Sequence, residues 1–183
     1  MRMSRASSAA ALLAFFAGLS AQNSSAAEPL VLAHNGRSLA PIVVFKDAPP
    51  FTRGAAEELA EYIEKISGAR PEVIEGKPDR MPEHAIWVGY QPVLDKLFPD
   101  IDFDFKHPEE ILISANGTHL VIAGRDRWDP EYIDKPLKRN LRMSVGLQAE
   151  YGTANAVYTF IQDFLDVRWL WPGELGEDVI TQY

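Results

Sequence analysis

Three aspartates with alternate spacing are the first residues in this sequence whose pattern suggests chemistry. Asp100, Asp102 and Asp104 are spaced like the first ligands of an EF-hand calcium loop. That loop also needs a glycine at its sixth position and a bidentate glutamate at its twelfth, where this chain has Phe105 and Ile111. We therefore interpret the segment as a solvated edge with three inward-facing apolar residues: Ile101, Phe103 and Phe105.

The remaining acids and histidines do not form a recognisable catalytic or metal-binding pattern. Glu109 and Glu110 are adjacent before an expected strand and would point to opposite faces, so we interpret them as solvated charges. No His-x-x-x-His spacing and no Gly-x-Ser-x-Gly motif accompanies the four histidines. The chain has no cysteine, which excludes disulfides and thiolate chemistry. We predict no catalytic residue, metal site or cofactor in this chain.

Aromatic and basic side chains are the stronger candidates for a contact site. Trp169 and Trp171 are two residues apart on an expected strand and would share a face, which could stack on a sugar ring or pack on a neighbouring domain. We favour packing for this pair. The next candidates are Trp128, Tyr132 and Arg142, in a segment that otherwise reads as a solvated loop. Arginines there, Arg125 and Arg127 included, could pair with the carboxylate of a uronic acid.

Hydrophobic periodicity predicts the elements that would position these residues. A helix is expected from Thr52, as its N-cap, to Ser67, where Ser67-Gly68 ends it. A second helix is expected to be capped by Thr153 and to bury one apolar face. The expected strands are Val31 to Leu32, Pro41 to Phe45, Val73 to Ile74, Ala85 to Val88, Ile111 to Ser114, Leu120 to Ala123 and Val167 to Trp171.

Turn residues and this element order predict the fold class. Asn116-Gly117 predicts a type I′ hairpin turn between two of the strands. Residues Arg125 to Ala149 lack sustained periodicity and are expected to form a long exposed excursion. The resulting order β-β-α-β-β-β-β-α-β predicts an α/β (α+β) domain, a mixed β-sheet with two main helices packed on one face.

Composition limits the class of protein further. The chain has 183 residues, 46% of them apolar, which is enough for one ordinary core. Residues 1–27 resemble a secretory signal, with Arg2 and Arg5 before a short apolar run and small residues before Glu28. Its removal would take the formal charge from -8 to -10, because it contains those two arginines and no acid. We expect an exported, periplasmic or extracellular single domain over residues 28–183, with no nucleic-acid partner and no membrane span.

Several segments together resemble a known domain family. They are AAEELAEYIEKISGARPEV, AIWVG, EEILISANGTHLVIAG and YGTANAVYTFIQDFLDVRWLWPGELGEDV. Between Leu30 and Val179 they resemble the non-catalytic N-terminal α/β domain of α-glucuronidases and β-hexosaminidases, called hexosaminidase domain 2-like. The spaced residues that carry the resemblance are Gly68, Gly89, Gly124, Gly152-Thr153, Ala156-Val157-Tyr158 and Arg168-Trp169. The long segment from Arg125 to Ala149 departs from the family pattern.

The resemblance implies an accessory role in carbohydrate metabolism. In such glycoside hydrolases the catalytic carboxylates lie on a barrel that follows this domain, and no Asp-Glu dipeptide of the hexosaminidase kind occurs here. We therefore expect the accessory domain of an exported glycoside hydrolase, whose partner is a catalytic barrel outside this chain. The alternative is a free-standing carbohydrate-binding or adaptor module that uses Trp128, Trp169 and Trp171. A self-contained small hydrolase is disfavoured by the missing carboxylate pair.

Overall fold

A mixed sheet of five strands forms the centre of the molecule. The computed structural model describes residues 30–129 and 147–181. The strand order is β4-β3-β5-β7-β6. Neighbours among β3, β4, β5 and β7 are parallel, and only β6 is antiparallel, to β7. This confirms the predicted α/β (α+β) class. The strand bounds are Ile42–Val44 (β3), Val73–Glu75 (β4), Ala85–Val88 (β5), Ile111–Ala115 (β6) and His119–Gly124 (β7).

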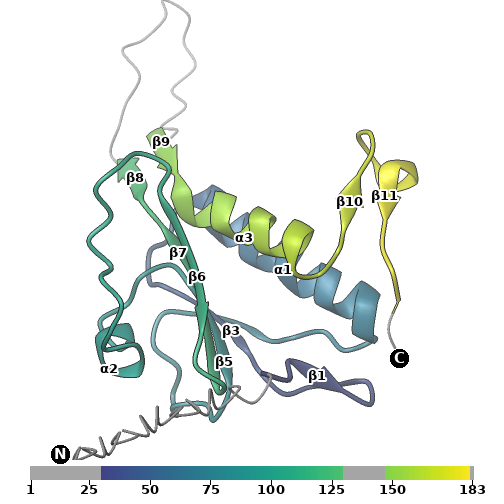
Figure 1. The fold of residues 1–183 in the computed structure, drawn as a ribbon, viewed down its shortest axis with the longest axis horizontal. Helices are drawn as coiled ribbons and strands as arrows, with labels where there is room; N and C mark the ends of the chain where they lie inside the picture. The colour runs from purple at the N-terminus through teal and green to yellow at the C-terminus, as the bar shows by residue number, and fades with distance from the viewer. Residues whose placement is uncertain (1–29, 130–146, 182–183) are drawn as a thin grey trace, which may run out of the picture.

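The two long helices lie side by side on one face of this sheet. They are α1 (Pro50–Ser67) and α3 (Gly152–Asp163), and Figure 1 shows them next to each other and running in the same direction. Their apolar faces form one core with the inner residues of β3, β5 and β7. The short helix α2 (Leu94–Leu97) packs on the opposite face, around Trp87. Ile101, Phe103 and Phe105 pack against this second core, as the sequence predicted.

The type I′ turn occurs in a different hairpin from the one for which it was predicted. The strands β1 (Ala33–His34) and β2 (Arg37–Ser38) pair across Asn35 and Gly36, whose φ angles of 51° and 69° fit a type I′ turn. The expected strand at Val31 to Leu32 is therefore wrong, because the turn fixes the pairing two residues later. The turn between β6 and β7 is not of type I′, since Gly117 has a positive φ but Asn116 does not.

The helices begin differently from the prediction, which took both threonines as N-caps. The helix α1 begins at Pro50 after the N-cap Pro49, because proline already has a helical φ and needs no N–H at the first position. Thr52 is buried inside the first turn, two residues after Pro50. The N-cap of α3 is Tyr151, and the Thr153 hydroxyl instead bonds to the backbone N–H and carbonyl of Gly124, at 3.1 and 3.2 Å.

Two ribbons outside the main sheet flank α3 at its opposite ends (Figure 1). The segment expected to be an irregular excursion is paired at its edges, because β8 (Asp126–Asp129) and β9 (Leu147–Tyr151) are antiparallel. At the other end, β10 (Arg168–Trp169) pairs with β11 (Glu177–Asp178), and the 3-10 turn η1 (Glu174–Gly176) lies between them. The strand expected from Val167 to Trp171 is therefore shorter than predicted.

The backbones of β7 and α3 cross at two glycines. A Cβ atom on Gly124 would lie 2.3 Å from the carbonyl carbon of Gly152. A Cβ atom on Gly152 would lie 2.4 Å from the amide nitrogen of Arg125. Both neighbours are main-chain atoms held by hydrogen bonds, Arg125 N–H to the Glu110 carbonyl and Gly152 N–H to the Arg125 carbonyl, each 2.9 Å. Neither position has room for a side chain.

We predict that Gly124→Ala lowers the free energy of unfolding by at least about 2 kcal/mol, because β7 and α3 must separate to admit the methyl group. Gly54→Ala is the matched control, since a Cβ there meets no atom within 4 Å on an exposed turn of α1. The control should be neutral or more stable by up to about 1 kcal/mol, from helix propensity. Urea denaturation measures both variants, and equal stabilities would contradict the crossing as a constraint.

Candidate functional site

Trp169, the first of the two predicted contact tryptophans, attaches the C-terminal ribbon (residues 168–178) to α1. Its indole Nε1–H donates to the Tyr62 hydroxyl at 2.6 Å, and its ring meets those of Tyr62 and Tyr158 edge-on. A second attachment is the ion pair between Lys65 and Glu177, at 2.6 Å. Burial raises the pKa of Tyr62, whose hydroxyl oxygen accepts the Trp169 N–H. Trp169 is thus mainly a packing residue.

Trp171 is in a different position from Trp169. The strand β10 ends at Trp169, and the chain bends before Pro172-Gly173, so the expected arrangement of both rings on one strand face is wrong. Trp171 is 55% exposed, and its neighbours Leu170 and Leu175 are 64% and 90% exposed. The ribbon therefore presents three large apolar side chains to solvent.

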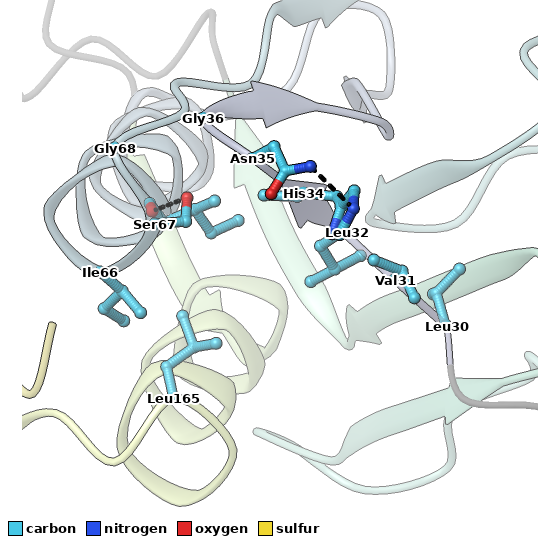
Figure 2. A pocket seen from close by; sticks show the side chains of 12 residues that line it. Leu30, Val31, Leu32, His34, Asn35, Gly36, Ile66, Ser67, Gly68 and Leu165 are labelled. Carbon is cyan, nitrogen blue, oxygen red and sulfur yellow. Dashed lines mark hydrogen bonds between the residues drawn. The ribbon is translucent and has the colours of Figure 1, made fainter. Parts of the chain in front are cut away.

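A groove of about 830 Å³ lies where the two long helices end. Figure 2 shows Ile66 of α1 and Leu165, just beyond α3, on one side and the segment from Leu30 to Leu32 on the other. The β1–β2 turn at Asn35 and Gly36 completes its wall. This helix-end groove is mostly apolar. Its walls come from β1 and the C-terminal end of α1, which lie away from β8 and β9 in Figure 1, as the C-terminal ribbon does.

The other predicted contact residues are not brought together with the C-terminal tryptophans. Trp128 is half-buried on β8, opposite Gln148 of β9, at the far end of α3. Tyr132 and Arg142 lie outside the described residues. Arg125, which was predicted as a partner for the carboxylate of a uronic acid, is already paired with a carboxylate of the protein. Its Nε lies 2.8 Å from Glu150 Oε2.

A polar cluster that sequence reasoning missed surrounds the start of α3. We call Glu109, Arg125, Asp126, Glu150 and Thr153 the strand-end cluster. Asp126 Oδ1 accepts the Thr153 N–H at 3.1 Å, and so caps α3 from a different segment of the chain. The Glu109 carboxylate accepts the Tyr151 N–H at 3.2 Å and the Asn155 amide at 2.6 Å. The sequence held one clue to this cluster. Arg125 and Asp126 directly follow a parallel strand, and open α/β sheets bind ligands at the carboxyl ends of their strands.

Asp126 is the most informative titratable group of this cluster. Burial raises its pKa, and the nearby charge of Glu109 acts in the same direction. Hydrogen bonding from Thr153 opposes that rise without cancelling it. A carboxyl group held in this way at the end of a strand can donate or accept a hydrogen bond to a ligand.

Within residues 30–129 and 147–181, no group of three His, Asp or Glu side chains is placed to hold a metal ion. Asp102 and Asp104 are engaged locally, since Asp102 Oδ1 accepts the Asp104 N–H at 2.9 Å and Asp104 pairs with Lys106. No helix in the described part of the chain is long and apolar enough to cross a membrane.

The two C-terminal tryptophans should respond differently to truncation. We expect Trp169→Ala to lower the free energy of unfolding by about 2 to 4 kcal/mol, because it removes ring packing and the bond to Tyr62. Trp171→Ala should change it by less than about 0.5 kcal/mol, as for an exposed surface position. Urea denaturation of both variants separates these roles, and a larger loss for Trp171→Ala would refute them.

The raised pKa of Asp126 predicts a pH-dependent stability. The folded protein binds the Asp126 proton more tightly than the unfolded chain does, so this contribution is full below the ordinary pKa of 3.8 and is lost as pH rises through the raised value. Asp126→Asn cannot ionise but keeps an oxygen for the Thr153 N–H. Its stability relative to the wild type should therefore increase between about pH 3 and pH 7.

Thermal denaturation of the wild type and Asp126→Asn across that range tests this expectation. Asp79→Asn, which removes a carboxyl group from an open loop, is the control. A difference between wild type and Asp126→Asn that stays constant or decreases with pH would contradict it.

Comparison with known proteins adds no family assignment to this geometry. No family model matches the chain, and no curated protein matches it.

Proposed function

We propose that this chain is the non-catalytic accessory domain of an exported glycoside hydrolase of the α-glucuronidase or β-hexosaminidase kind. In this proposal the domain is periplasmic or extracellular and docks on a catalytic barrel that supplies the carboxylates for glycoside hydrolysis. It needs no cofactor of its own. Its contribution to carbohydrate metabolism is to hold the barrel and to shape the rim of the substrate cleft.

The observation that carries this proposal is the exposed apolar surface of the C-terminal ribbon. Leu170, Trp171 and Leu175 project from a ribbon whose strands have two residues each. So short a ribbon does not bury these side chains itself, and exposed apolar patches on exported proteins mark contact surfaces. The helix-end groove adds further apolar surface at the same end. A barrel packed there would cover both.

The alternative proposal is a free-standing carbohydrate-binding or adaptor module. Its support is the exposed ring of Trp171, which could stack on a sugar. The ring of Trp169 does not form a flat platform with it, because that ring packs edge-on against Tyr62 and Tyr158. Oligosaccharide-induced quenching of tryptophan fluorescence that disappears in Trp171→Ala would favour this module over the accessory domain.

The coding sequence that follows the Tyr183 codon tests the assignment most directly. We expect a continuing frame, or an adjacent gene, to encode a barrel with a pair of catalytic carboxylates. Co-expression of that barrel with this chain should give a stable complex. A genome region that encodes no such barrel would refute the accessory role.

We predict that the isolated chain self-associates through the C-terminal ribbon. The double variant Leu170→Asp, Leu175→Asp should be monomeric in sedimentation velocity and equally folded by circular dichroism, because both side chains are exposed. The control is Met81→Asp, which places the same charge at an exposed apolar residue in the loop before β5 and should leave self-association intact. Loss of association in the control alone would place the contact elsewhere.

A further inference from the structure

A shallow cleft of about 310 Å³ opens at the carboxyl ends of the parallel strands. One side of it is aromatic, and the other is formed by polar residues of the strand-end cluster. Its lining includes residues at or just after the carboxyl ends of β3, β5 and β7. Open α/β sheets bind ligands at this end of their strands. The lining residues are Phe45, Tyr90, Phe103, Phe105, Gly124, Arg125, Asp126 and Thr153.

We propose that this strand-end cleft binds a neutral sugar ring. A pyranose presents apolar C–H faces and a rim of hydroxyl groups, so it needs an aromatic surface beside fixed hydrogen-bonding groups. The cleft offers both. The following contacts support the assignment.

The aromatic side is ordered and accessible. The rings of Tyr90 and Phe103 are tilted by 41° with centroids 5.3 Å apart. Tyr90 is 42% exposed, and its hydroxyl donates to Asp95 at 3.0 Å, which fixes the orientation of the ring. Phe103 packs on the second core. A ligand can therefore stack without first ordering the aromatic side chains.

The polar side retains hydrogen-bonding capacity. Asp126 uses Oδ1 for the Thr153 N–H, and a carboxylate has about four acceptor sites in all. Arg125 is held by Glu150 at 2.8 Å and by the Lys106 carbonyl at 2.9 Å, which leaves further guanidinium N–H groups free to donate. Asp126 can thus accept from one sugar hydroxyl while Arg125 donates to another.

The charges of the cluster select against an anionic ligand. The single guanidinium of the cluster, Arg125, is already paired with Glu150, and the Glu109 carboxylate lies close enough to Asp126 to raise the pKa of that carboxyl. A uronate or phosphate would approach two carboxylates without a free cation in the cluster. A neutral ring gains the same hydroxyl contacts without this repulsion, which is why the proposal specifies a neutral sugar.

The cleft is spatially separate from the proposed docking surface. The strand-end cleft lies at the start of α3, and the C-terminal ribbon lies beyond its end (Figure 1). The sugar site therefore does not rest on the presence of a barrel, and each proposal can fail without the other.

Titration of the isotopically labelled full chain, followed by amide chemical shifts, tests the cleft. The probes are D-xylose, D-glucose and N-acetyl-D-glucosamine, with sodium D-glucuronate as the anionic comparison. We expect at least one neutral sugar to shift the amides of Tyr90, Phe103, Gly124 to Asp126 and Thr153, and glucuronate to bind more weakly. Tyr90→Ala should weaken binding by about three- to tenfold, and Tyr90→Phe should retain it because the ring remains.

Phe164→Ala is the matched control, a truncation of an exposed aromatic residue at the other end of α3 that should leave the titration unchanged. Three results would overturn the proposal: no shifts at the cleft with any neutral sugar, shifts confined to the C-terminal ribbon, or tighter binding of glucuronate than of the neutral sugars. Unchanged binding in Tyr90→Ala would also refute the stacking surface. Circular dichroism of each variant confirms that it is folded.

Discussion

The close crossing of β7 and α3 is the constraint on which the rest of the molecule depends. Two glycines let the backbones meet, and the Thr153 hydroxyl bonds to both polar groups of Gly124. This contact sets where α3 begins, so it also places the strand-end cluster at one end of the helix and the C-terminal ribbon at the other. Asp126 completes the junction by accepting the Thr153 N–H at the start of α3, where the positive end of the helix dipole favours an acceptor.

Periodicity in the sequence predicted the elements that bury apolar surface, but not the contacts made by their ends. The five strands of the main sheet and both long helices were foreseen because hydrophobic spacing determines burial. The helix starts were misplaced, since Pro49-Pro50 outcompetes Thr52 as a start and Thr153 is used for a tertiary bond. The pairing of β8 with β9 was missed because it joins residues separated by a long segment without periodic pattern.

The contacts of the candidate site residues were likewise not predictable from local sequence patterns. Packing was expected for Trp169 and Trp171 together, but only Trp169 is attached to α1, and its partner Tyr62 lies 107 positions earlier, which no local pattern reveals. The strand-end cluster combines Glu109, Asp126 and Thr153 from three separate segments, so only the topology could bring them together. Burial of Asp126 depends on that assembly, and its raised pKa is a property of the fold.

The attachment of the C-terminal ribbon to α1 has a mechanical consequence. Trp169 and Glu177 hold the ribbon through Tyr62 and Lys65, both in the second half of α1, although the chain reaches it from α3. A force on the ribbon is therefore carried by both α1 and α3, which pack on the same sheet. Rotation of the ribbon about α3 alone would break the Trp169–Tyr62 hydrogen bond and the Lys65–Glu177 ion pair, so the two helices together fix its orientation.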